Sequence, residues 1–145
     1  MKLKVFFDTN VILDVLLGDR PNSSASYSLF EVVKEGLMEG VVTTQSLLDA
    51  AYIVGKMRAE SRGAIRQQIL NLMKFLNVDA PNSFDLKEAC LSQGDLEDEA
   101  QLAVALDRYC HYIVTGDEQF RAYHSGDTRI RFITPSELVS LMRED

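Results

Sequence analysis

Residues 4–17, KVFFDTNVILDVLL, decide how the rest of this sequence is interpreted. A short apolar run, rich in β-branched and aromatic residues, stops at Asp8, and the chain turns apolar again after Thr9 and Asn10. The first run predicts a buried strand followed by a helix. Because ligands collect just beyond the carboxyl ends of strands in open parallel sheets, Asp8 is a candidate site residue. The alternative is that Asp8 only caps the helix, since Asp, Thr and Asn are all good caps.

Short strand-like runs alternate with longer helical patterns along the whole chain. Strands are predicted over residues 3–7, 40–44, 111–115 and 129–134, with a weaker one over 77–80. This alternation is typical of the α/β class, in which a parallel sheet is covered by helices. The region 45–76 predicts two helices that form a hairpin, because 61–63 interrupts its helical pattern, and 18–24 predicts a loop. Thr134, Pro135 and Glu137 have the spacing of a capped helix start.

Length and composition predict one globular domain covering residues 1–145, because 145 residues with 46% apolar content can bury a substantial core. The first residues do not form a signal peptide, and no apolar run is long enough to span a bilayer, so we expect a cytoplasmic protein without a membrane partner. Cys90 and Cys110 lie in helix-like segments without CxxC spacing, which favours buried free thiols.

The formal charge of −7 argues against broad electrostatic adhesion to nucleic acid, which normally needs a basic surface. Carboxylates gathered in one metal pocket would add to this charge without describing the rest of the surface. The net charge therefore does not exclude a nucleic-acid substrate.

A second acidic group lies in residues 94–110, GDLEDEAQLAVALDRYC. On a helix, Asp95 and Asp98 are separated by roughly 60° around the axis, so they share one face. The alternative is again structural: acids in a first turn complement the helix dipole, and the Asp95–Asp98 pair resembles a capping box.

Two further acids follow predicted strands. Asp117 comes one glycine after the strand that ends at Thr115, and Asp49 lies three residues after Ser46 in the helix that follows another strand. Asp117 could instead be a turn residue, and Asp49 could belong to a helix cap.

Taken together, these acids indicate a shared site, because three of them follow separate strands at the carboxyl ends of the sheet, where open parallel sheets bind ligands. Like charges about 4 Å apart repel by roughly 1 kcal/mol in water and about 4 kcal/mol at an effective dielectric of 20. Several carboxylates without interleaved His or Cys suit a hard cation, Mg²⁺ or Mn²⁺. Such ions activate a water molecule that hydrolyses phosphodiesters, so no protein nucleophile is required. This agrees with the sequence, in which no Ser/His/Asp or Cys/His set is evident. The sequence context of His111 and His124 favours a structural role for each.

The sequence resembles the PIN domain family of metal-dependent ribonucleases, which includes the toxins of VapBC-type toxin–antitoxin pairs. The resemblance runs from FFDTNVILD through DLEDEAQLAVA and IVTGDEQF to RFITPSEL. It implies a three-layer α/β/α fold around a parallel sheet of four to five strands. It also implies an endoribonuclease that holds Mg²⁺ or Mn²⁺ and cleaves RNA through an activated water.

Carried over residue by residue, the resemblance implies that Asp8, Asp98 and Asp117 are the catalytic metal ligands. Asp95 and Glu97 match an acidic lead-in found in one branch of the family, and Asp95 is expected nearer the ion than Glu97. Asn10 and Thr115 match the polar positions that orient the carboxylates through hydrogen bonds. Where the family usually has a Glu on the second helix, this sequence has the shorter Asp49. Asp49 and Asp95 are each either a further metal ligand or part of a helix cap.

Residues outside the acidic set bear on the substrate and on partners. Lys56, Arg58, Arg62 and Arg66 give the helical hairpin a local excess of cations that could bind RNA, or that could pair with Glu60 and its neighbours instead. Tyr27, Tyr52 and Tyr123 could stack on bases or pack in the core. A cognate antitoxin and a homodimer are implied by the resemblance alone.

Two other functions remain open at this stage. A PIN-like domain without catalytic activity could serve as a protein-binding module. A haloacid dehalogenase-type phosphatase also places an Asp after its first strand, but it needs a second Asp two positions later, where this sequence has Asn10.

Overall fold

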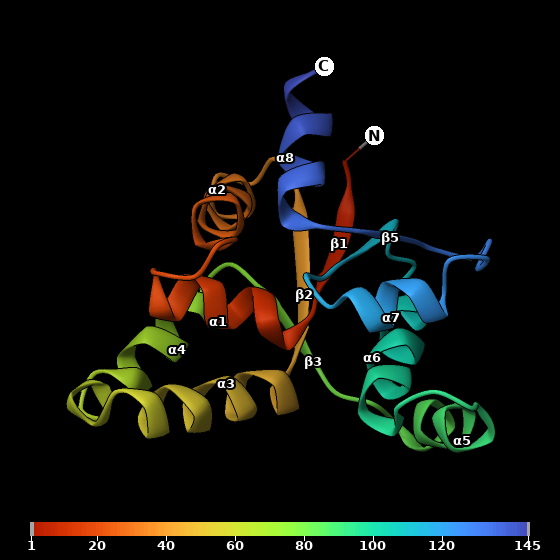
Figure 1. The fold of residues 1–145 in the computed structure, drawn as a ribbon, viewed down its shortest axis with the longest axis horizontal. Helices are drawn as coiled ribbons and strands as arrows, with labels where there is room; N and C mark the ends of the chain where they lie inside the picture. The colour runs from red at the N-terminus through yellow and green to blue at the C-terminus, as the bar shows by residue number, and fades with distance from the viewer. Residues whose placement is uncertain (1, 145) are drawn as a thin grey trace.

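The computed structural model describes residues 2–144, and its centre is a parallel sheet with the strand order β3-β2-β1-β4-β5 (Figure 1). The strands are β1 (Lys4–Phe7), β2 (Glu39–Thr43), β3 (Asn77–Asp79), β4 (Tyr112–Val114) and β5 (Arg131–Ile133). The helices are α1 (Thr9–Leu17), α2 (Ser23–Lys34), α3 (Thr44–Met57), α4 (Ile65–Met73), α5 (Ser83–Leu91), α6 (Leu96–Asp107), α7 (Glu118–Tyr123) and α8 (Pro135–Arg143), with a short 3-10 helix η1 (Ala59–Ser61). The predicted α/β fold with a parallel sheet is confirmed.

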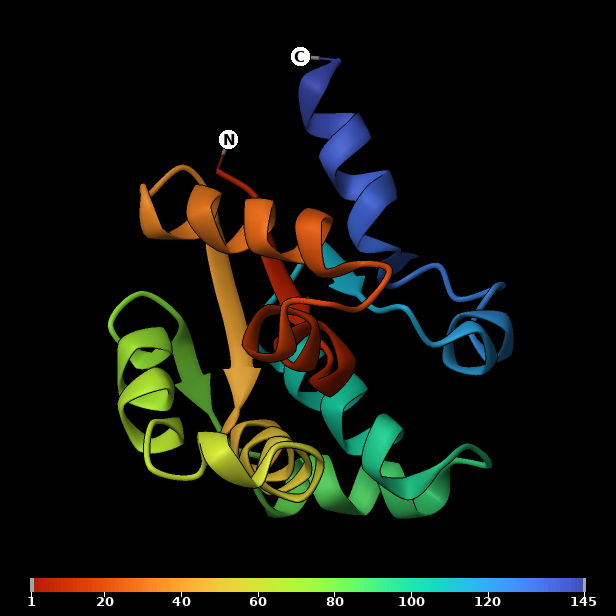
Figure 2. The same ribbon diagram turned by 60° about the vertical axis from the view of Figure 1, so that its left-hand side comes forward.

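The central strand β1 divides its side chains between two hydrophobic cores. Val5 and Phe7 pack into a core with α1, α2, α3, α4 and α8, whereas Phe6 packs with α6 and α7 on the other face. All three side chains are fully buried, since successive residues of a strand point to opposite faces. The figures show these two helical layers with the sheet between them (Figures 1 and 2), which is the predicted three-layer arrangement.

The sheet has its topological switch between β1 and β4. The chain leaves β1 toward β2 and later returns to pair β4 with the opposite edge of β1. At the carboxyl ends of these two strands, the Asp8 amide donates to Val114 O at 3.1 Å and the Thr115 amide donates to Ile133 O at 3.0 Å. The residues that follow β1 and β4 therefore lie side by side, at the place where open α/β sheets bind ligands.

Local sequence signals account for most helix boundaries. Thr134 and Glu137 form the predicted capping box, and Pro135 occupies the first helical position of α8. The predicted hairpin over 45–76 is present as α3 and α4, with the break at residues 58–64. The predicted loop over 18–24 is shorter than expected, because α2 begins at Ser23 and the Ser23 hydroxyl bonds Asp14 O at 2.7 Å.

The prediction of two buried thiols on helices is only half right for each cysteine. Cys90 lies on α5 but is exposed, because it does not lie on the face of the helix that is buried through Asp85 and Ala89. Cys110 is buried but lies beyond the end of α6, and its burial raises the pKa of its thiol to about 11. Both thiols are free.

None of the helices described over residues 2–144 has the length and hydropathy that a membrane crossing requires.

Gly40 tests the packing between β2 and the larger core. A Cβ atom at this position would lie 2.7 Å from the Phe7 ring, 2.9 Å from Leu76 and 3.2 Å from Val33. Because these contacts leave no room for a methyl group, Gly40→Ala should lower the free energy of unfolding by about 1–3 kcal/mol in urea denaturation. Gly63→Ala is the matched control, since nothing lies within 4 Å of its Cβ. Equal stability of the two variants would contradict this packing.

Candidate active site

Asp8 lies at the carboxyl end of β1 and is only 4% exposed. It is the N-cap of α1, where its Oδ1 accepts from the Thr9 amide at 2.7 Å. Its Oδ2 accepts from Asn10 Nδ2 and from the Thr115 hydroxyl, both at 2.8 Å. Asp8 therefore is a helix cap, as the structural alternative expects, and it also lines a depression of about 550 Å³.

Asn10 and Thr115 connect Asp8 to the segment after β4. Asn10 Oδ1 accepts from the Gly116 amide at 2.9 Å, and the Thr115 hydroxyl oxygen accepts from the Asp117 amide at 3.0 Å. The Thr115 hydroxyl thus touches the side chain of one acid and the backbone of another. These bonds fix Asp8 relative to Asp117.

Asp117 is the N-cap of α7, and its Oδ1 accepts from the amides of Gln119 and Phe120 at 2.9 and 3.2 Å. Asp98 lies in the first turn of α6, and its amide donates to the Asp95 carboxylate at 3.1 Å. Asp95 is therefore the cap of α6, although the reciprocal bond of a full capping box is missing. The depression that contains Asp8 is also lined by Asp98 and Asp117.

Asp49 comes from α3 and completes the acidic lining. The cap of α3 is Thr43, whose hydroxyl accepts from the Ser46 amide at 3.0 Å, so the proposal that Asp49 belongs to a helix cap is wrong. Asp49 lies one turn further along α3 and contacts Glu97 of α6. Both residues line the same depression as Asp8. Asp95 instead lines a neighbouring depression, together with Asp98 and Asp117.

The acidic residues affect one another electrostatically. Burial raises the pKa of Asp8, and its hydrogen bonds from Thr115 and Thr9 oppose this effect. Burial, together with the charges of Asp8, Asp95 and Asp117, raises the pKa of Asp98 to about 7. A hydrogen bond to Asp49, followed by burial, raises the pKa of Glu97 to about 7. Such shifts arise where carboxylates are buried close to one another without a compensating cation.

The donor atoms of this depression suit a hard divalent cation. Its acidic side chains are carboxylates, and the remaining polar lining comes from hydroxyl and amide groups. Such oxygen donors are the ligands that Mg²⁺ and Mn²⁺ prefer. Within residues 2–144, however, no three His, Cys, Asp or Glu side chains already stand in the arrangement of a formed metal site. The residues fit the cation by chemistry and location, and the roles of individual ligands remain predictions.

Two buried polar residues near Asp8 were missed by the sequence reasoning. Gln101 lies near Asp8 and accepts from the Ser46 hydroxyl at 3.2 Å, while the Thr9 hydroxyl bonds Ser46 Oγ at 2.9 Å. Gln101 and Ser46 are both nearly inaccessible to solvent. The spacing from Asp98 could have revealed Gln101, because residues three apart on a helix share a face. Ser46 gave no comparable signal, since its partners come from three separate elements.

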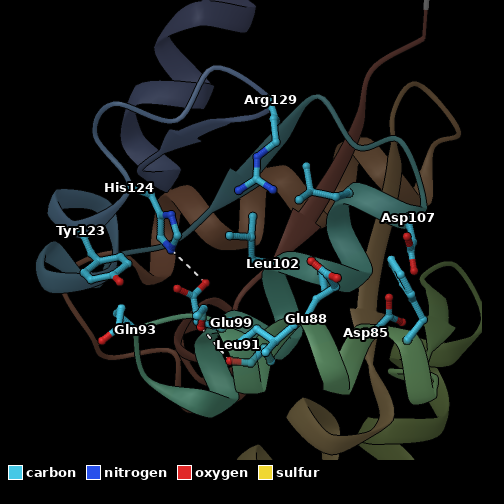
Figure 3. Close-up of a pocket in the computed structure, with 15 residues that line it drawn as sticks. Asp85, Glu88, Leu91, Gln93, Glu99, Leu102, Asp107, Tyr123, His124 and Arg129 are labelled. Carbon is cyan, nitrogen blue, oxygen red and sulfur yellow. Dashed lines mark hydrogen bonds and ion pairs between the residues drawn. The ribbon is translucent and has the colours of Figure 1, made fainter.

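The second missed pair is Glu99 and His124. His124 Nε2 lies 3.0 Å from Glu99 Oε2, and both side chains are largely buried (Figure 3). Glu99 follows Asp98 on α6, and His124 follows the last residue of α7, the helix that Asp117 caps. This contact ties together the two helices that carry Asp98 and Asp117, and it gives His124 the structural role expected from its sequence context.

The predicted RNA-binding cations are used in different ways. Arg58 donates to Leu17 O at 2.8 Å and pairs with Asp19, and Arg62 donates to Gly55 O at 3.0 Å. Lys56 lies over the ring of Tyr52, which lines the depression beside Asp8. The predicted pairing with Glu60 is absent from the ion pairs of residues 2–144, and Arg66 likewise forms none. Of the four, Lys56 has the clearest connection to the site.

Comparison with known proteins identifies the family. A family model described as PIN domain matches residues 4–119, which is most of the chain, so the resemblance predicted from sequence is confirmed. No curated protein sequence matches the chain.

Solved structures with the same fold include VapC20 of Mycobacterium tuberculosis, a sarcin–ricin-loop-cleaving toxin, with a TM-score of 0.65 and 13% identity over 88% of this chain and 98% of that one. A toxin–antitoxin complex from Klebsiella pneumoniae matches with a TM-score of 0.61 and 15% identity over 90% of this chain and 97% of that one. VapBC2 of Rickettsia felis, bound to a DNA fragment from its promoter, matches with a TM-score of 0.59 and 13% identity over 91% and 98%.

The charge crowding at Asp98 has a measurable effect on stability. Because the folded protein raises the pKa of Asp98 from 3.8 to about 7, the folded state binds the extra proton between these values and loses stability as the pH rises through this range. Asp98→Asn should therefore raise the melting temperature at pH 8 in EDTA, by about 2–4 °C for each kcal/mol gained. The gain should shrink toward pH 4. Glu60→Gln, on the exposed 3-10 helix, is the control. A lower melting temperature of Asp98→Asn than of the wild type at pH 8 would contradict the raised pKa of Asp98.

Proposed function

Because this chain belongs to the PIN domain family, we propose that it is a metal-dependent endoribonuclease that hydrolyses RNA phosphodiester bonds. The observation that carries the proposal is the shared depression of Asp8, Asp98 and Asp117, which come from three different elements of the fold. A binding module without catalysis would have no need to keep these carboxylates crowded, because the crowding costs stability. The family match and Asn10 disfavour the phosphatase alternative.

We propose that Asp8, Asp98 and Asp117 hold Mg²⁺ or Mn²⁺, with Asp49 and Asp95 as further candidates. When bound, the cation supplies the positive charge that lowers the pKa of a nucleophilic water and stabilises the leaving oxygen of an in-line displacement. The protein's part is to orient its carboxylates. Asn10 and Thr115 donate to Asp8 Oδ2 and so hold the carboxylate in one orientation beside the depression.

The negative charge of the protein limits how RNA can approach. The carboxylates would repel phosphate until a cation neutralises them, so substrate binding should depend on the metal. Lys56 and Tyr52, one turn apart on α3, are placed to contact RNA at the edge of the depression. Arg58 and Arg62 already bond within the protein, which weakens their assignment as RNA contacts.

A role as the toxin of a toxin–antitoxin pair is the biological setting we propose. It is supported by the similarity to VapC20 and to the toxin–antitoxin complexes from Klebsiella pneumoniae and Rickettsia felis. A cognate antitoxin would inhibit the enzyme by covering the acidic depression, where a basic side chain would find charge complementarity. A homodimer and a cytoplasmic location are further expectations of the same proposal.

Cleavage of RNA should require both a divalent ion and Asp98. Wild-type protein incubated with mixed cellular RNA should cut it in Mg²⁺ or Mn²⁺ and stop in EDTA. Asp98→Asn and Asp8→Ala should reduce the rate by at least about 100-fold, because each removes a proposed ligand. The retained melting transition of Asp98→Asn controls for folding. Equal cutting by Asp98→Asn at matched purity would contradict the assignment, and absence of saturable Mn²⁺ binding in calorimetry would favour the binding module.

Thr115 tests the orienting role separately from ligation. Thr115→Val keeps the side-chain shape but removes the hydroxyl that donates to Asp8 and accepts from the Asp117 amide. Mn²⁺ affinity and cleavage should fall by about 10–100-fold, the usual effect of losing a group that orients a ligand. Thr44→Val, at an exposed position of α3, is the matched control. Unchanged Mn²⁺ affinity of Thr115→Val in calorimetry would remove Thr115 from the site.

A further inference from the structure

A second depression, of about 490 Å³, borders the candidate active site. It shares Asp98 and Asp117 with the depression that contains Asp8, so the two meet at these carboxylates. Away from them, its lining includes Gln93, Gln119 and Tyr123. A second hollow thus adjoins the proposed cleavage site at these two carboxylates.

The floor of this second depression is fixed by packing. Glu99 and His124 form it with their 3.0 Å contact, and the His124 ring stacks on Phe132 of β5 with centroids 5.2 Å apart and planes within 3°. Gly94 lies so close that a Cβ there would be 2.4 Å from Glu99 Oε1. The buried side of this hollow is therefore packed against neighbouring residues.

The rim, in contrast, carries side chains that are free to contact a ligand. Tyr123 is 54% exposed, and its ring meets that of His124 at an angle of 71°, with the ring centroids 4.9 Å apart (Figure 3). Gln93 lies beside it in the same view. Gln93 and Gln119 are exposed, and neither side-chain amide bonds to another residue in the part of the chain described, 2–144.

The chemistry of the rim excludes a phosphate and fits a nucleobase. The lining of this hollow contains no Lys or Arg, and its one imidazole, that of His124, already contacts Glu99. The proposed cation would neutralise Asp98 and Asp117, but Asp95 would still repel a second phosphate in this hollow. A neutral, planar group rich in donors and acceptors suits an aromatic face flanked by two carboxamides, because single-stranded RNA is read by stacking and by hydrogen bonds to base edges.

We propose that this second depression binds one nucleobase of the RNA, that of the nucleotide next to the phosphate at Asp98 and Asp117. Tyr123 stacks on the base, and Gln93 and Gln119 bond its edge. The inference rests on the proposed ribonuclease function and adds a specificity-determining site to it. Carboxamides offer both donors and acceptors, so the two glutamines set which base is preferred.

Cleavage kinetics on short RNAs that vary one base at a time test the subsite. Tyr123→Ala should lower kcat/KM by roughly 5- to 150-fold, the factor that corresponds to about 1–3 kcal/mol of stacking on one base. Tyr123→Phe should keep most of the activity, because the ring remains. Gln93→Ala with Gln119→Ala should flatten the base preference. Tyr27→Ala is the matched control, since Tyr27 is 57% exposed on α2 and lines neither depression.

A binding assay separates the subsite from the catalytic proposal. In the Asp98→Asn background, addition of Tyr123→Ala should weaken the affinity for a fluorescein-labelled RNA hexamer, measured by anisotropy, while Tyr27→Ala should not. Tyr123→Ala alone should leave Mn²⁺ affinity unchanged. A wild-type protein that cleaves RNA but shows the same kcat/KM and base preference after Tyr123→Ala would overturn the subsite and leave the function standing. A wild type that cleaves no RNA would overturn both.

Discussion

The switch in strand order between β1 and β4 is the constraint on which the proposed site depends. It brings the residues after two adjacent strands together, so Asp8 and Asp117, which are far apart in sequence, become neighbours joined through Thr115. The α6 helix then adds Asp98 from the layer behind the sheet. Because Asp8 is buried with three hydrogen bonds, it cannot turn to solvent to avoid the other charges. The fold thus imposes a crowding of carboxylates that an isolated helix cap would avoid.

This crowding of carboxylates makes the site suitable for a cation and also lowers the stability of the fold without one. Oxygen donors held close together bind a hard cation well. Burial and the neighbouring charges raise the pKa of Asp98, and a hydrogen bond to Asp49 together with burial raises the pKa of Glu97. The Glu99–His124 contact limits how far α6 and α7 can separate in response. The same contact forms the floor of the hollow next to the carboxylates. Metal binding, helix packing and the proposed recognition of a base are therefore linked through adjacent residues of α6.

Sequence reasoning succeeded where a local pattern had one structural meaning. The apolar runs predicted the parallel sheet, and the polar residues that interrupt them placed Asp8 and Asp117 together, as the structure has them. Their role as metal ligands stays a prediction. The alternative that Asp49 belongs to a helix cap was wrong, because Thr43 caps α3. The prediction of a buried Cys90 was wrong, because helical periodicity alone did not show which face of α5 is covered. The pairing of Glu99 with His124 could not be inferred, since it joins residues 25 positions apart whose contact depends on how α6 and α7 pack.

The central claim is that Asp8, Asp98 and Asp117 hold one divalent cation between them, and anomalous diffraction from crystals grown in Mn²⁺ tests it most directly. The account predicts an anomalous peak bounded by oxygens of these three side chains, at about 2.1 Å, after the carboxylates have turned toward it. Crystals of this chain in millimolar Mn²⁺ that show no anomalous peak in this depression would contradict the claim. A peak whose ligands are other residues would contradict it as well.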